Sequence, residues 1–342
     1  MHYSMFPLLS NMIEREPGRF VGPLSRALGW VFNIIFEIFN NPTMIGVALG
    51  LSIIVITFFM RTLILPLGIK SHKSMMKMQR IAPEMDALKK KYEGKTDPEL
   101  KRKMQMEIQE LYRKNNVNPL MGCLPALATM PVFIGLNYIF RHVFMYVDHI
   151  RDVYYRIAVE IITLIPPGVY GDRNPENFRF WFDEIEPMLR SNVVVEPSSA
   201  DSMTRAVARF SEGQWDNIRE YAAELGGSYS HLNELLAERA TVESFLWWDM
   251  IGSAGWVLPG VLIPLLAMVT MVCSTLLMQR ANKSKDPAQK MQQRIMIIVM
   301  PLFFGFITIQ MPLGVGFYWV MSNIYQIGQH YVLTQYYKNK PL

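Results

Sequence analysis

The sequence predicts an all-α polytopic membrane protein with five transmembrane helices, a cytoplasmic helical hairpin and an extra helical domain outside the cell. Of its 342 residues, 51% are hydrophobic and only 18% are charged. The apolar residues also form runs long enough to cross a bilayer as helices. The lysines give the orientation, because all of them fall in 70–114, 283–290 or 338–340. Short loops rich in Lys and Arg stay in the cytoplasm.

The N-terminal part is predicted to lie outside. Residues 1–28 form an extracellular segment with no visible secretory signal peptide, since the first twenty residues lack a basic stretch followed by an apolar core. Residues 29–41 then predict an amphipathic helix that lies in the outer interface, because its apolar stretch is too short to cross. Asn40-Asn41-Pro42 separates this helix from the first span, 43–68.

Residues 69–118 predict a cytoplasmic hairpin of two polar helices. The turn is Glu93-Gly94-Lys95-Thr96, and Asp97-Pro98 gives the second helix a cap and a proline at its first position. Each helix carries an apolar stripe at helical spacing, and we expect the two stripes to pack together. Lys89, Lys90 and Lys91 are either a solvated face near anionic lipid or a docking face for an acidic or RNA-bearing partner.

Four more spans follow the hairpin. Asn118-Pro119 starts the second span, whose prolines predict a bend. Pro312, Gly314 and Gly316 predict a tight turn between the last two spans, which should form an antiparallel hairpin. The cytoplasmic parts that remain are the loop 279–293 and the tail 338–342. The four spans are 119–147, 254–278, 294–311 and 315–337.

The segment 148–253 is predicted to be an extracellular helical insertion. It contains no lysine, and its acids outnumber its arginines. Ser211 with Gln214 predicts a capping box, and Gly226-Gly227 predicts a helix stop. Pro166-Pro167-Gly168 and the stretch 196–199 are typical of loops. The charge pattern and the number of spans agree on an outer N-terminus and a cytoplasmic C-terminus.

Enzymatic and metal chemistry are not indicated. No predicted span carries a catalytic pattern of the Ser/His, Asp/Asp or HExxH kind. The two cysteines, Cys123 and Cys273, lie far apart in apolar stretches without CxxC or Cys/His spacing. The sequence therefore predicts a protein that is not an enzyme and has no catalytic residue, no metal and no cofactor.

Arg61 is the most informative residue of the chain. It lies in an uncharged run from Met44 to Ile69, which is about 39 Å long as a helix at ~1.5 Å per residue. Guanidinium stays charged in proteins, and a cation at a span's centre costs ~2.5–3.5 kcal/mol on insertion scales. Two interpretations remain open: Arg61 reaches the headgroups beside Ile69, or it faces a wet cavity inside a helix bundle.

A polar stripe on the last span favours the cavity. Trp319, Asn323, Gln326 and His330 fall at i, i+4, i+7 and i+11, and therefore on one helix face. No Asp or Glu lies within any predicted span. A membrane cation without an anionic partner needs water, lipid phosphate or an incoming anion.

Three stretches resemble the YidC/Oxa1/Alb3 family of membrane protein insertases. They are Thr57-Phe58-Phe59-Met60-Arg61 with Leu65-Pro66-Leu67, Gly122-Cys123-Leu124-Pro125 with Met130-Pro131-Val132-Phe133, and Pro312-Leu313-Gly314 with Phe317-Tyr318-Trp319, Ser322-Asn323 and Gln329. Their order and spacing resemble the family over 29–147 and 254–337, and the five-span form is similar to Gram-positive members. Two departures stand out: Thr129 replaces a glutamine that many relatives carry, and 148–250 replaces a short loop.

The resemblance implies five helices around a hydrophilic groove that is open to cytoplasm and lipid. The groove would contain Arg61 as its central cation, and the polar stripe adds Asn323 and Gln326 to its wall. The family pattern places six more residues at the groove or a substrate helix: Thr57, Thr129, Met130, Phe133, Tyr318 and Trp319.

The resemblance also implies partners. These are nascent membrane proteins, the ribosome, and the Sec translocon or the signal recognition particle machinery, with anionic lipids but no sequence-specific nucleic acid. Docking on the cytoplasmic side would use Lys89, Lys90, Lys91, Lys283 and Lys285. The expected location is the plasma membrane.

The expected mechanism is that Arg61 attracts a polar or acidic flank into the groove while the hydrophobic segment slides into lipid. One alternative is a small-anion transporter with Arg61 as its binding site. Such transporters have repeats or intramembrane acids, which this sequence lacks. The other alternative is a membrane-anchored extracellular sensor or scaffold.

Overall fold

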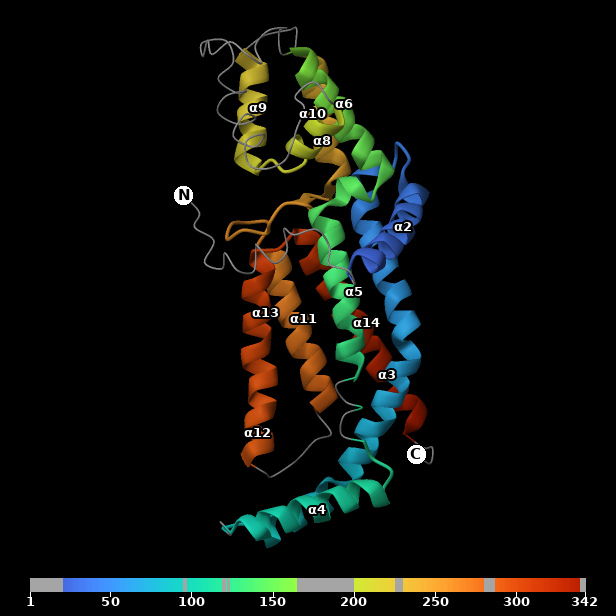
Figure 1. Cartoon of the computed structure of the whole chain (residues 1–342), viewed down its shortest axis with the longest axis vertical. Helices are drawn as coiled ribbons and strands as arrows, with labels where there is room; N and C mark the ends of the chain where they lie inside the picture. Colours follow the sequence, from blue (N-terminus) through green and yellow to red (C-terminus); the bar gives the residue numbers. More distant parts are fainter. Residues whose placement is uncertain are drawn as a thin grey trace. The chain divides into compact units, whose positions relative to one another are not determined.

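The computed structural model describes residues 21–94, 97–118, 121, 124–164, 200–224, 230–279 and 287–338 (Figure 1). The expectations for 1–20, for the loops at 166–168 and 196–199 and for Gly226-Gly227 lie outside this part. The chain divides into two compact units. Unit 1 is Met1–Ile53 with Gly135–Gly252, and unit 2 is Ile54–Ile134 with Ser253–Leu342. The described residues are mostly helical, which confirms the α-helical class.

Unit 1 begins with α2, Val21–Phe39, which extends the predicted interfacial helix toward the N-terminus. Its apolar stripe already starts at Leu24 and Leu28, so the helical spacing continues upstream of the predicted start. The predicted break at 40–42 is confirmed, because α3 begins only at Ile45. The Asn41 side-chain oxygen accepts the backbone N–H groups of Thr43 and Met44 at 3.2 and 3.1 Å.

The rest of unit 1 is a helical group that ends in a β-hairpin. The Ser211 and Gln214 side chains each accept the other's backbone N–H, at 3.4 and 2.8 Å, which confirms the capping box. Trp215 is buried among the helices. The elements are η2 Val143–Met145, α6 Asp148–Leu164, α8 Ala200–Val207, α9 Glu212–Glu224, α10 Ser230–Val242, β1 Ser244–Phe245 and β2 Trp248–Asp249.

Helix α3 runs from Ile45 to Lys91 without a break. The first span and the first hairpin helix, which the sequence suggested as separate segments, therefore form one helix that contains Pro66 and Pro83. Helix α4, Pro98–Lys114, begins as predicted, with the Asp97 side chain accepting the N–H of Glu99 at 2.9 Å. The expected packing of the two stripes is only partial, because no residue of α4 is buried.

Unit 2 packs α11, α13 and α14 together (Figure 1). One bound differs from the predicted spans, because α11 begins at Leu262 rather than 254. The described part of α5 begins at Leu124, and the predicted start at 119 lies outside the described residues. Pro259 and Gly255, whose φ is +62°, precede α11 and do not favour a helix. The elements are α5 Leu124–Arg141, α11 Leu262–Gln279, α12 Pro287–Arg294, the π-helix η6 Ile295–Val299, α13 Met300–Ile309 and α14 Leu313–Tyr337.

The turn between α13 and α14 is shorter than predicted. Gly314 and Gly316 lie inside α14, which begins directly after Pro312. A Cβ on Gly316 would come within 2.6 Å of Thr308 Cγ2 and 2.9 Å of Ile263 Cγ2. This glycine therefore permits close helix packing rather than a turn.

By length and apolar composition, α3 and α11 are the described helices that are able to cross a membrane. Shorter apolar helices run over Leu127–Arg141 and Ile295–Ile309. The arrangement of five spans stays a prediction.

Candidate functional site

Arg61 lies on α3 in unit 2 and is half-buried. Its Nε atom is buried and has no hydrogen-bond partner among the described residues. Among the residues that the structure describes, no Asp or Glu forms an ion pair with Arg61. A buried donor without a hydrogen-bond partner raises the free energy of the folded protein. Binding of water or of an acceptor from another molecule at this guanidinium is therefore favoured.

The first of two hollows beside Arg61, which we call the Trp319 hollow, has a volume of about 150 Å³. This is room for several water molecules. Asn323 is fixed in its wall, because its amide donates to Thr270 Oγ1 at 3.1 Å and to the Ala267 carbonyl at 3.4 Å. The lining is Arg61, Ala267, Met268, Met271, Pro301, Phe304, Gly305, Thr308, Trp319 and Asn323.

The second hollow, the His330 hollow, has a volume of about 60 Å³. The His72 and His330 rings meet edge to face, with their centroids 5.1 Å apart. His72 Nε2 is buried without a hydrogen-bond partner. The lining is Arg61, Ile64, Gly68, Ser71, His72, Met75, Pro125, Met278, Gln326, Gln329, His330 and Leu333. Arg61 is therefore the residue that the two hollows share.

An aromatic cluster forms part of the same site. Trp319 stacks on Phe133 with centroids 5.0 Å apart, and Phe304 meets the Trp319 ring edge-on at 5.1 Å. Tyr325 contacts Phe58 at 5.4 Å, and its hydroxyl lies 3.2 Å from Thr62 Oγ1. Rigid aromatic rings beside a polar hollow provide an apolar surface next to hydrogen-bonding groups.

The structure brings only some of the predicted site residues together. Arg61, Trp319, Asn323 and Gln326 line the hollows, and Phe133 joins them through Trp319. The other four predicted residues line neither hollow. Thr57 and Tyr318 are buried, Thr129 is half-buried and Met130 is exposed.

Sequence reasoning did not assign His72, Ser71 or Gln329 to the site. The signal was present, because Arg61, Ile64, Gly68, Ser71 and Met75 continue one face of a helix. Ending the predicted span at residue 68 cut that face in two.

The predicted docking lysines differ in their contacts. Lys90 is exposed, whereas Lys91 pairs with Glu107 at 3.2 Å. Tyr92 also donates to Glu107, at 2.7 Å. Hydrogen bonds from Tyr92 and Lys91 lower the pKa of Glu107, which stays ionised and neutralises part of this face. Lys89 is half-buried, and Lys283 and Lys285 lie outside the described residues.

Comparison with known proteins gives consistent matches. The chain is 26% identical to membrane protein insertase YidC of Oceanobacillus iheyensis over 94% of this chain and 83% of that relative. It is 26% identical to membrane protein insertase MisCA of Bacillus subtilis over 83% of this chain and 69% of the relative. A YidC of Clostridium perfringens is 40% identical over 34% of this chain, a match that spans about half (48%) of the relative.

The model of one protein family, described as 60Kd inner membrane protein, matches residues 40–187 and 225–340. These two ranges contain every residue that lines the hollows beside Arg61. Because the match covers well over half of the sequence, the chain belongs to the 60Kd inner membrane protein family.

Proposed function

We propose that this chain is a membrane protein insertase that receives segments of nascent membrane proteins in a positively charged groove around Arg61. The insertase activity follows from the family and from relatives that are named membrane protein insertases. The groove mechanism is supported above all by Arg61, which lines two hollows and whose buried Nε has no hydrogen-bond partner in the part of the chain that the structure describes.

The groove would work by reducing the thickness of hydrocarbon that a polar flank of the client protein has to cross. The interaction energy of two charges scales inversely with the effective dielectric, so Arg61 attracts an acidic or polar flank more strongly at membrane depth than it would in water. The flank would in turn give Arg61 Nε the hydrogen-bond partner that it lacks among the described residues. Asn323 and Gln326 supply further polar groups in the lining of the two hollows.

The hydrophobic part of the client would then move from the groove into lipid. Phe133 and Trp319 form an apolar wall for it, and the exposed Met130 is an adaptable contact. Thr57, Thr129 and Tyr318 would shape the same wall from behind. Leaving water for lipid is favourable by ~25 cal/mol per Å² of apolar surface, so no covalent chemistry is needed.

The proposal includes a topology in the plasma membrane. Five spans would place the N-terminus and 148–253 outside, with the hairpin 69–118, the loop 279–293 and the tail 338–342 in the cytoplasm. Lys89, Lys90, Lys91, Lys283 and Lys285 would then face the ribosome, the Sec or signal recognition particle machinery, or anionic lipid. Contact with these partners would be electrostatic and salt-dependent.

An insertion assay with Arg61→Ala and Arg61→Lys tests the groove. We expect Arg61→Ala to lower the insertion of clients with an acidic flank, and Arg61→Lys to restore it at least in part because the charge is retained. Lys70→Ala is the matched control, since it removes one cation from the same helix without lining either hollow. If Arg61→Ala and Lys70→Ala insert every client equally well, the groove mechanism is wrong although the family assignment stands.

A further inference from the structure

The β-hairpin at the end of unit 1 carries an exposed apolar tip. Strands β1 and β2 pair Ser244 with Asp249 and Phe245 with Trp248, which leaves Leu246 and Trp247 as the two-residue loop. These two side chains are 54% and 64% exposed. Trp247 also leans on Trp248, with ring centroids 4.9 Å apart. The tip is therefore a small aromatic and aliphatic surface that its own unit does not cover.

The backbone of the tip makes this composition unusual. Leu246 has a φ of +59°, in the left-handed region that Asn, Asp and Gly favour in two-residue hairpin loops. A loop in water gains nothing from a leucine at such a position. The apolar side chain is present despite the cost to the backbone, which suggests a role for it at this place.

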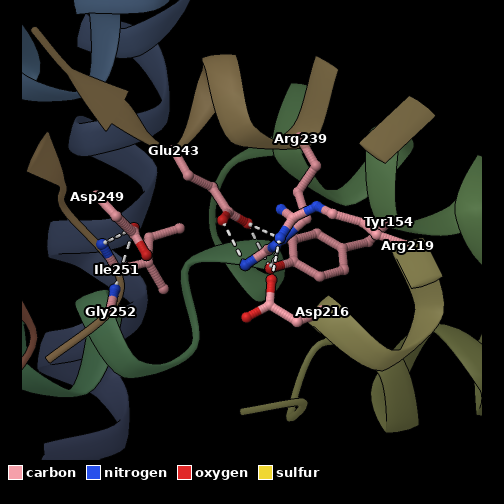
Figure 2. A network of polar contacts seen from close by, with 8 residues as sticks. All are labelled: Tyr154, Asp216, Arg219, Arg239, Glu243, Asp249, Ile251 and Gly252. Atoms are coloured by element: carbon pink, nitrogen blue, oxygen red, sulfur yellow. Dashed lines mark hydrogen bonds and ion pairs between the residues drawn. The ribbon is translucent and has the colours of Figure 1, made fainter. Parts of the chain in front are cut away.

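The two acidic side chains that flank the hairpin form hydrogen bonds or ion pairs within unit 1. The Asp249 carboxylate accepts the backbone N–H groups of Ile251 and Gly252 at 2.9 and 3.1 Å (Figure 2). Glu243 is buried and paired with Arg239. The segment from Ser244 to Trp248 carries no charge, so no ionised side chain in it opposes burial in an apolar medium.

The base of the hairpin rests on α3. Ser244 Oγ donates to the Gly46 carbonyl at 3.4 Å, and the Phe245 ring covers Gly50 so closely that a Cβ there would meet Phe245 Cδ2 at 2.0 Å. Gly50 lies about 9 Å along the uncharged run that starts at Met44. If that run of about 39 Å is centred on a hydrocarbon core of about 30 Å, Gly50 lies roughly 5 Å inside the core.

From the apolar tip, its strained loop and its seat on α3, we infer that the hairpin inserts Leu246 and Trp247 into the outer leaflet of the bilayer. The partner is phospholipid, because tryptophan, like tyrosine, is enriched at membrane interfaces. The inference depends on α3 crossing the membrane as proposed above. Its consequence is an anchor for unit 1, because the Met250 N–H bonds the Glu243 carbonyl at 3.0 Å and Glu243 is tied to α6 and α10.

Spin labels at single cysteines test the depth of the tip. Cys123 and Cys273 are first replaced by alanine, and the full chain is reconstituted in phospholipid nanodiscs. A label at Leu246→Cys is compared with one at Glu234→Cys, an exposed polar position of unit 1, and one at Val55→Cys, an exposed position on α3. We expect the label at residue 246 to collide with oxygen and to be shielded from a water-soluble nickel complex. The label at residue 55 should behave in the same way, whereas the label at residue 234 should be accessible to the nickel complex.

Three other results would overturn the inference. If the nickel complex reaches the label at residue 246 as readily as the label at residue 234, the tip lies in water. Shielding from both reagents means that protein covers the tip, either a second copy or a client. If the label at Val55→Cys itself reacts like the one at Glu234→Cys, the proposed span is misplaced, which is a failure of the topology rather than of the hairpin alone.

A second measurement avoids the cysteine variants. Brominated phospholipid quenches tryptophan that it touches, so Trp247→Phe should lower the quenchable share of the emission. Trp215→Phe is the control, because Trp215 is buried in unit 1. An unchanged quenchable share in Trp247→Phe would contradict insertion of the tip.

Discussion

At the scale of residues, one buried ion pair organises the helices of unit 1. Arg239 Nη2 lies 2.8 Å from Glu243 Oε2, and the two side chains are only 5% and 2% exposed. The guanidinium also lies 4.1 Å from the centre of the Trp215 ring. The Tyr154 hydroxyl donates to Glu243 (Figure 2). The pair thus joins α6, α9 and α10, the helices that support the hairpin.

Arg239→Met should destabilise unit 1 more than the double variant Arg239→Met with Glu243→Leu. Above about pH 7, where Glu243 is ionised, removing its partner leaves a buried charge uncompensated, at a cost of about 3–5 kcal/mol. Replacing both charges with apolar side chains of similar size is often close to neutral. Hydrogen exchange of the α6 and α10 amides in the detergent-solubilised chain measures the difference. A double variant that opens more readily than Arg239→Met would contradict this account.

Unit 1 should also lose stability as the pH rises toward neutrality. Burial, with a smaller contribution from Asp249, raises the pKa of Glu243 from its usual 4.5 to about 7, against the opposing effect of Arg239. The folded form then binds a proton more tightly than the unfolded form, so this contribution to stability is fully present below about pH 4.5 and is lost as the pH rises through about 7.

Glu243→Gln is the matched control for this pH dependence. It keeps the shape of the side chain but cannot ionise, so hydrogen exchange of α10, corrected for the intrinsic effect of pH, should vary less with pH than in the original chain. Equal pH dependence in both proteins would show that another group is responsible.

At the scale of elements, local signals were predictable and tertiary constraints were not. The Ser211–Gln214 box and the Asp97 cap lie within three residues of their partners, so the sequence alone determines them. The role of Gly316 depends on Thr308 and Ile263, which no local pattern identifies. The continuity of α3 was missed for the same reason, because tertiary contacts decide whether Pro66 ends a helix or lies inside one.

In the candidate site, too, the residues set by local spacing were predictable and those set by tertiary contacts were not. The polar stripe on α14 was readable from spacing, and Trp319, Asn323, Gln326 and His330 do line the hollows. The place of His72 in the site could not be predicted from spacing, because its partner His330 lies on another helix. The charge pattern also placed residue 72 in the cytoplasmic hairpin. To find such residues from sequence, the helical spacing that starts at Arg61 has to be continued beyond the end of the apolar run.

Gly316→Val should destabilise the packing of α14 against α13 and α11. The added Cβ would lie 2.6 Å from a Thr308 carbon atom, and overpacking of this kind typically costs about 1–3 kcal/mol. Gly328→Ala on the same helix is the control, because a Cβ there meets nothing within 4 Å. Thermal unfolding of the purified chain in one detergent should show a lower midpoint for Gly316→Val and no loss for Gly328→Ala. Equal midpoints would mean that α14 shifts freely.

At the scale of the whole molecule, the candidate site belongs to one unit. Every residue that lines the Trp319 and His330 hollows lies in unit 2. The family match omits 188–224, a stretch that includes α8 and α9 of unit 1. The residues that carry the proposed mechanism therefore belong to a different unit from the helices that lie outside the family match.

Replacing 148–250 with a flexible linker should leave insertion largely intact. The deleted segment supplies no residue to either hollow, so a client with an acidic flank should still meet Arg61. A His72→Cys and His330→Cys pair, cross-linked by a short bismaleimide, reports whether unit 2 remains folded, since the two rings are 5.1 Å apart. If the cross-link forms but insertion falls to the level of Arg61→Ala, the outer segment takes part in insertion and the separation argued here is wrong.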